Sequence, residues 1–178
     1  IGIYSLFAAR LNHSTVSFEP ESHNFAALNI NINDNNFEKK IISYPISLDE
    51  KMKISQLNIF KFRFGSSGHS FDRSINSKGK DFDTSHIQGS ISITLDKFCE
   101  ETNIYPDHVK IDVDGNELRV VKGMKDLLAS KKIKSILIEL DRSYSEHIEV
   151  VSILKSFDYK LIYKNDKDGV SNHIFNRN

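Results

Sequence analysis

Short apolar runs alternate with helical patterns along most of the chain, and this alternation limits the folds it can adopt. Runs of strand length occupy residues 15–18, 40–46, 109–113 and 133–140. Helical patterns occupy residues 3–9, 22–33, 94–102, 117–130 and 146–157. Strands that alternate with helices form a parallel sheet with helices on both faces. The sequence therefore predicts an α/β fold with a mostly parallel sheet, in which Ser22 is the expected N-cap of the second helix.

Two further apolar segments, residues 159–163 and 173–176, close the chain. They are separated only by a turn around residues 166–169. A short turn joins antiparallel strands, whereas parallel strands need a crossover of a dozen or more residues. We therefore expect a C-terminal hairpin that adds an antiparallel edge to the sheet.

The middle of the chain follows a different period. In residues 57–64 Phe60, Phe62 and Phe64 alternate with Lys61 and Arg63, and residues 90–95 alternate in the same way. Strict alternation is typical of half-buried strands. Alternating Phe and basic residues also occur in single-stranded nucleic-acid sites, although a half-buried strand is the commoner cause. We interpret residues 57–95 as an inserted antiparallel pair whose long polar loop, residues 65–89, is a candidate lid.

The length of the chain favours a single domain that spans residues 1–178, and its composition argues against several classes of partner. The 24 basic and 24 acidic residues cancel, which argues against duplex DNA. Cys99 has no partner for an internal disulfide, as expected for a cytoplasmic protein. No apolar run approaches the roughly 20 residues of a membrane helix. Asp81, Asp83 and His86 match no metal-ligand spacing, so no metal is expected, and the oligomeric state stays open.

Carboxylates follow most of the predicted parallel strands, in the segments Glu19-Pro20, Ser47-Leu48-Asp49, Asp112–Gly115 and Glu139–Asp141. In open α/β sheets, ligands bind beyond the carboxyl ends of the strands. Carboxylates that lie close together at one edge repel one another, and each is costly to bury without a partner. We therefore expect this edge to be functional.

Glu19 follows a strand directly and lies 17 residues after Gly2. In nucleotide-type sites an acidic residue about 20 residues after the glycine turn accepts hydrogen bonds from ribose hydroxyls. An exposed turn residue before Pro20 is the alternative, and we favour the ribose role. The spacing does not distinguish a nicotinamide cofactor from S-adenosylmethionine.

Residues 110–117 (KIDVDGNE) place three acids at a strand-to-helix turn. Gly115 permits the sharp turn, and Asp114 or Asn116 can cap the next helix. Capping does not explain Asp112. Lys110 is unexpected in a buried parallel strand, so it should snorkel or pair with a carboxylate.

Taken in order, these motifs resemble those of the FkbM-type methyltransferases, a branch of the S-adenosylmethionine-dependent class I fold. The matching segments are Ile1-Gly2-Ile3-Tyr4-Ser5, Phe18-Glu19-Pro20 with Asn24-Phe25, Thr94-Leu95-Asp96, residues 110–117 with Val121-Lys122-Gly123, and Ile138-Glu139. The resemblance implies a Rossmann-like class I methyltransferase domain. The family's first strand precedes Ile-Gly and is absent here, so we expect an N-terminally truncated chain.

The resemblance also implies the reaction, which is methyl transfer from S-adenosylmethionine to a hydroxyl of a sugar, glycan or secondary metabolite. Glu19 would hold the ribose diol and Asp112 would face the amino group of the cofactor. Gly2 would let the backbone approach the methionine end, and residues near Ser47 would line the adenine. The cofactor-binding motifs of the family further include Tyr4, Ser5, Pro20 and Val113.

An alcohol loses its proton when it attacks the methyl group, which requires a general base. The candidates are Asp114, Glu117, Glu139 and His69. Asp114 stands where the family usually has Glu and is shorter by one methylene.

Two other classes of function stay open. One is a non-catalytic methyltransferase-like interaction module, which the missing first motif would permit. The other is a nicotinamide-dependent oxidoreductase on a similar sheet. The ordered motifs and the antiparallel final strand argue against the oxidoreductase.

Overall fold

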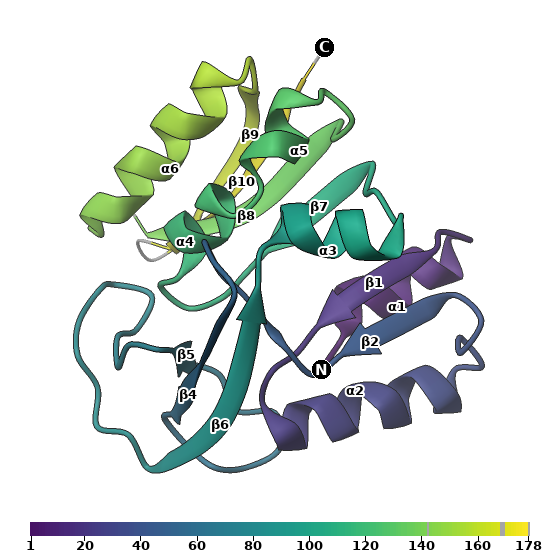
Figure 1. Cartoon of the computed structure of the whole chain (residues 1–178), viewed down its shortest axis with the longest axis vertical. Coiled ribbons are helices and arrows are strands. Elements are labelled where there is room, and N and C mark those ends of the chain that lie inside the picture. Colours follow the sequence, from purple (N-terminus) through teal and green to yellow (C-terminus); the bar gives the residue numbers. More distant parts are fainter. Residues whose placement is uncertain (142, 168–169, 178) are drawn as a thin grey trace.

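The strands of the described residues form three separate sheets, with helices packed beside them (Figure 1). This computed structural model describes residues 1–141, 143–167 and 170–177. Both parallel and antiparallel pairs occur in two of the sheets. The prediction of a mostly parallel sheet is therefore wrong, because tightly connected segments in the middle and at the end of the chain pair antiparallel.

The first sheet contains two parallel strands, β1 (Thr15–Phe18) and β2 (Ile41–Tyr44). Helices α1 (Ile3–Arg10) and α2 (Ser22–Asp34) lie beside it. They share a small apolar cluster with the sheet, formed by Ala9, Leu28, Ile32 and Ile41.

The N-cap of α2 is Glu21 rather than the expected Ser22. The Glu21 carboxylate accepts hydrogen bonds from the backbone N–H groups of His23 and Asn24, at 3.0 and 2.7 Å. A carboxylate is well suited to this position because the helix N-terminus carries partial positive charge.

The second sheet has the order β7 (His108–Ile111), β8 (Ser135–Asp141), β10 (Val170–Asn176) and β9 (Lys160–Lys167). β7 and β8 are parallel, whereas β10 is antiparallel to both of its neighbours. The expected C-terminal antiparallel hairpin is therefore present, and its second strand lies inside the sheet. Residues 168 and 169 of its turn lie outside the described residues.

The third sheet has the order β3 (Ser47–Leu48), β6 (His86–Ile93), β4 (Lys53–Ile59) and β5 (Ser70–Phe71). β4 and β6 are antiparallel. The strand expected over residues 57–64 ends at Ile59, and the three Phe side chains beyond it are exposed. Gly65, at a φ of 72°, turns the chain toward α2. There its N–H donates to the Asn24 side chain at 2.9 Å.

The helix expected over residues 117–130 is split into α4 (Glu117–Lys122) and α5 (Lys125–Ala129). The break falls at Gly123. A Cβ there would collide with the backbone carbonyl of Asp49. The Gly123 carbonyl accepts a hydrogen bond from the Asp96 N–H at 3.1 Å instead of continuing a helix. A close approach between distant segments therefore interrupts a periodic pattern.

The largest apolar core lies between the second sheet and the helices α3 (Leu95–Thr102), α4, α5 and α6 (Ser145–Ser156). Phe98 of α3 connects this core to the first sheet. Its ring meets Phe18 edge-on at 4.9 Å between centroids and Tyr44 at 5.0 Å. No helix in the described part of the chain combines the length and apolar character that a membrane crossing requires.

Candidate active site

Carboxylates from three strand ends gather at one edge of the molecule. Glu19 follows β1, Asp112 and Asp114 follow β7, and Glu139 lies near the end of β8. Burial is the main cause that raises the pKa of Glu19 and of Glu139, and the charge of Asp114 adds to both shifts. Part of the predicted row of acids is thus brought together from two different sheets. Asp49 instead pairs with Arg119, and Asp141 accepts hydrogen bonds from Ser143.

Glu19 is held by its neighbours on both sides. Its N–H donates to the Tyr44 carbonyl at 3.0 Å, and its carboxylate accepts from the Glu21 N–H at 3.0 Å. Burial raises the pKa of Glu19 to about 7, and the charges of Glu21 and Asp114 act in the same direction. A carboxylate with that pKa gains from any partner that donates hydrogen bonds to its ionised form.

Asp114 adopts a left-handed conformation, with a φ of 48°. This conformation aims its carboxylate at the loop after β4, where it accepts a hydrogen bond from the Gly68 N–H at 2.7 Å. Burial raises the pKa of Asp114, and the charges of Asp112 and Glu117 add to the shift. An elevated pKa brings a carboxylate closer to the range of an effective general base.

His69 lies beside Asp114 and Glu21, whose charges both act on it. Burial lowers the pKa of His69, so the ring is neutral near pH 7. Its Nδ1 accepts a hydrogen bond from the Phe60 N–H at 3.3 Å, which places the ring proton on Nε2. The Nε2 atom is buried, and the backbone of Ser66 acts on the ring as well.

Lys110 pairs with a carboxylate, as its position in a strand predicted. Its Nζ lies 2.6 Å from the Asp112 carboxylate and 4.4 Å from the centre of the Tyr4 ring. Burial raises the pKa of Glu139, and the charge and hydrogen bond of Asp112 raise it further. Asp112 thus connects Lys110 to Glu139 at the edge.

Glu117 points into the protein rather than toward this edge. It is 2% exposed, accepts hydrogen bonds from the Gly115 N–H, and lies 2.9 Å from His147 Nε2. Burial lowers the pKa of His147, but the hydrogen bond and charge of Glu117 outweigh it, and the net shift is upward. This buried pair joins α4 to α6 and occupies the carboxylate of Glu117.

The expected cofactor residues of the first motif surround α1. Gly2 precedes the helix with a φ of 79°, and a Cβ at this position would collide with Leu28. The Ser5 hydroxyl bonds to the Ser17 hydroxyl at 2.7 Å. Tyr4 is half exposed beneath Lys110. These residues lie beside β1 and the acidic edge.

The other expected cofactor residues have different surroundings. The Pro20 carbonyl accepts a hydrogen bond from the Gln88 side chain at 2.7 Å, which connects Glu19 to the third sheet. Val113 packs against the main core. Ser47 lies in β3, and its buried hydroxyl has no partner among the described residues.

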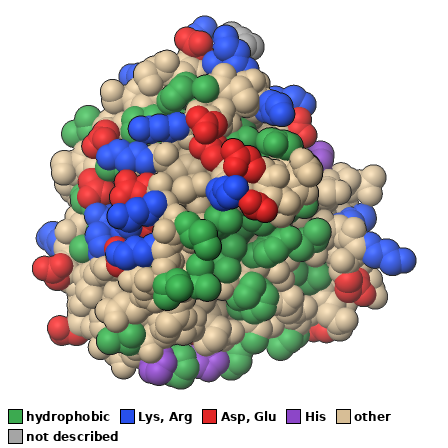
Figure 2. Space-filling model, in the orientation of Figure 1, with side chains coloured by type: hydrophobic (Ala, Val, Ile, Leu, Met, Phe, Trp, Pro, Cys, Tyr) green, Lys and Arg blue, Asp and Glu red, His purple; other side chains and the backbone are tan. Residues whose placement is uncertain are grey.

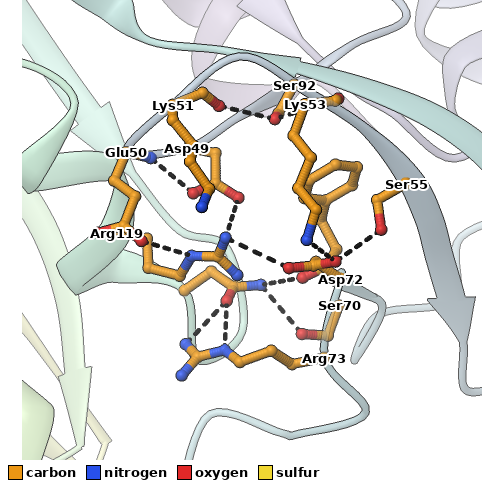
Figure 3. A network of polar contacts seen from close by, with 12 residues as sticks. Asp49, Glu50, Lys51, Lys53, Ser55, Ser70, Asp72, Arg73, Ser92 and Arg119 are labelled. Atoms are coloured by element: carbon orange, nitrogen blue, oxygen red, sulfur yellow. Dashed lines mark hydrogen bonds and ion pairs between the residues drawn. The ribbon is translucent and has the colours of Figure 1, made fainter.

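Two arginines that the sequence did not single out hold the middle segment against α4. Arg119 of α4 lies 2.8 Å from Asp49 and 3.5 Å from Asp72 (Figure 3). Asp72 also accepts hydrogen bonds from Lys53 and Ser55 of β4. Charged residues among other polar residues do not contribute to an apolar repeat. Nothing in the sequence therefore distinguished these positions.

Arg73 holds the turn that carries Asp114. Its guanidinium donates to the Asn116 side chain at 2.8 Å and to the Gly115 carbonyl at 2.9 Å, and it pairs with Glu146 of α6. The Asn116 amide in turn donates to the Ser70 hydroxyl at 2.9 Å. The loop that was expected to be a lid is therefore tied to the β7–α4 turn on both sides of β5.

The fold is α/β, and carboxylates line the edge where β1 and β7 end. The sequence pattern of the methyltransferase FkbM domain matches residues 2–161, and the chain belongs to that family of methyltransferases. The resemblance drawn from the ordered motifs is thereby confirmed. No curated protein matches the chain.

The fold is similar to that of a solved methyltransferase FkbM from Methylobacillus flagellatus KT. The TM-score is 0.63 at 15% sequence identity, and the match covers 98% of this chain. The matched part is 40% of the length of that protein.

Proposed function

We propose that this domain binds S-adenosylmethionine and transfers its methyl group to a hydroxyl of a sugar, glycan or secondary metabolite. The observation that carries the proposal is that Glu19, after β1, and Asp114, after β7, lie near enough for the charge of Asp114 to act on Glu19. Family membership supplies the methyl transfer, and the chemistry of this edge supplies the binding groups.

The residues at the edge fit the cofactor in the chemistry of their side chains. Glu19 would hold the ribose hydroxyls, because an ionised carboxylate accepts two hydrogen bonds. Asp112 would face the amino group. Gly2 would let the backbone approach the methionine end of the cofactor, and Leu28 fills the space that a Cβ at Gly2 would take. The unpartnered Ser47 hydroxyl would meet a polar group of the adenine.

When bound, S-adenosylmethionine supplies a methyl group that is already activated by the positive sulfur. The protein therefore needs mainly to position the acceptor oxygen and remove its proton. We assign the base to Asp114, whose raised pKa suits it for taking a proton. Glu139 is the alternative base, whereas Glu117 is already paired inside the protein.

Calorimetry with S-adenosylhomocysteine tests the proposal. We expect the unaltered chain to bind it and Glu19→Gln to lose at least about tenfold in affinity. Glu38→Gln, an exposed substitution of the same type, is the control and should bind as the unaltered chain does. Binding of NAD in place of S-adenosylhomocysteine would favour an oxidoreductase. Binding of neither would favour a non-catalytic module.

A further inference from the structure

Four aromatic rings form a continuous row beside the candidate active site. His86 stacks on Phe62 at 4.2 Å between ring centroids, with an angle of 27° between the planes. The centroid of the His23 ring lies 4.2 Å from that of Phe62 and 4.8 Å from that of Phe64. These rings come from three distant segments, namely α2, the loop after β4 and the start of β6. We call His86, Phe62, His23 and Phe64 the ring row.

The ring row is exposed. Phe64 is 62% exposed and Phe62 is 47% exposed, although both are large apolar side chains. In Figure 2 histidine and hydrophobic side chains lie beside each other along the lower edge, below the starts of β6 and α2. Exposed apolar groups gathered in one place are typical of a binding surface.

The ring row adjoins the candidate active site through one hydrogen bond. The His23 N–H donates to Glu21, whose charge acts on Glu19. Phe60, which lies two residues before Phe62 and outside the row, donates its N–H to His69 beside Asp114. A molecule seated on the rings would therefore extend toward the proposed base.

Two cations border the rings. Lys61 and Arg63 are exposed, and no carboxylate lies within ion-pair distance of either side chain in the described part of the chain. This differs from Arg73 of the same loop, which pairs with Glu146. Lys61 and Arg63 thus add two cations on either side of Phe62 in the chain. The Lys61 Nζ lies over Phe60, 5.1 Å from its ring centre, and the Glu21 carboxylate lies 3.5 Å from the His23 ring.

We propose that the ring row is the acceptor subsite and that the acceptor is a sugar carrying a carboxylate or phosphate group. This rests on the proposed methyl transfer. The C–H face of a sugar ring carries partial positive charge and stacks on the negative face of an aromatic ring. Lys61 and Arg63 complement an anionic substituent on that sugar. An acceptor hydroxyl would then point toward Asp114 and His69.

The test uses methyl β-glucuronide and its neutral counterpart methyl β-glucoside, titrated by saturation-transfer NMR. We expect the glucuronide to bind more tightly. Phe64→Ala should weaken its binding about 3- to 10-fold, and Phe64→Tyr should restore it. Phe7→Ala is the matched control, because Phe7 is 63% exposed and lies on α1, away from the row. Lys61→Gln combined with Arg63→Gln should remove the preference for the glucuronide.

Each variant is also titrated with S-adenosylhomocysteine, and this binding should be unchanged. Equal effects of Phe64→Ala and Phe7→Ala, with cofactor binding intact, would overturn the subsite and leave the proposed function standing. Absence of cofactor binding in the unaltered chain would overturn both. Tighter binding of oligothymidylate or phosphatidylserine vesicles than of the sugar, lost in Phe64→Ala, would assign the row to nucleic acid or membrane instead and overturn the inference.

Discussion

The carboxylate of Asp114 accepts a hydrogen bond from the backbone N–H of Gly68, which lies 46 residues earlier in the chain, at 2.7 Å. The bond joins the turn after β7 to the loop after β4. The proposed base is therefore oriented by a segment that belongs to another sheet. Changes that loosen this loop should alter the site even where they do not touch it.

Replacing Arg73 with Lys should loosen the loop. Lysine keeps the charge but cannot bond Asn116, the Gly115 carbonyl and Glu146 together, because it lacks the planar fork of arginine. We expect the free energy of unfolding to fall by about 1–3 kcal/mol. The amide of Gly68 should exchange its hydrogen faster, which NMR can follow. Arg10→Lys, on the exposed surface, is the control, and equal exchange in the two variants would contradict this role of Arg73.

Replacing Gly115 with Ala should destabilise the β7–α4 turn. Gly115 has a φ of 102°, and a Cβ would collide with the Asn76 carbonyl. We expect a loss of about 2–4 kcal/mol in the free energy of unfolding, measured by urea denaturation. Gly89→Ala is the matched control, since no atom lies within 4 Å of a Cβ there. That variant should be neutral or stabilised by up to about 1 kcal/mol.

Replacing Glu19 with Gln should stabilise the domain at neutral and higher pH. Burial raises the pKa of Glu19 from 4.5 to about 7, so the folded state holds this proton more tightly than the unfolded state. The stabilisation from Glu19 is complete below pH 4.5 and is lost as the pH rises through 7. At pH 8 we expect the free energy of unfolding of the variant to exceed that of the unaltered chain by about 1–3 kcal/mol. The two should agree near pH 4, and a constant difference across this range would contradict the assignment.

Replacing His147 with Gln should break the buried pair with Glu117. We expect a loss of at least about 2 kcal/mol in the free energy of unfolding at pH 6. The net pKa of His147 is raised, because Glu117 outweighs burial. Its contribution is therefore complete below pH 6.5 and declines as the pH rises through the folded-state pKa. The difference between the variant and the unaltered chain should shrink above pH 7, while His13→Gln, which is exposed, should show no such trend.

Replacing Asp114 with Asn should slow methyl transfer without weakening cofactor binding. Asparagine has the same shape and tolerates the left-handed backbone of this residue. We expect kcat to fall about 100-fold or more, because the amide cannot take a proton. The affinity for S-adenosylhomocysteine should change less than about twofold. A larger loss in Glu139→Gln than in Asp114→Asn would move the base to Glu139.

Features that depend on a segment's own residues were predictable. The apolar period located most helices and strands, and the short final turn predicted the antiparallel hairpin. The pairing of Lys110 with Asp112 also followed from local sequence, because a cation in a buried strand needs a nearby partner.

Features that depend on contacts between distant segments were not predictable. The split at Gly123 arises because the backbone of Asp49 occupies the space beside it. The Phe segment looked like a strand, but Asn24 draws its end toward α2. Arg73 gave no signal, because its partners lie more than 40 residues away in the sequence.

By itself, the sequence determined the family, the alternation of strands and helices, and the acids that follow the strands. Local side-chain pattern is enough for these, since it decides which face of each element is apolar. Only the tertiary structure decided which acids face the active edge and which are buried. It turned Asp114 toward Gly68 and the active edge, and buried Glu117 against His147. Those two carboxylates are three residues apart, and long-range packing alone gives them different partners.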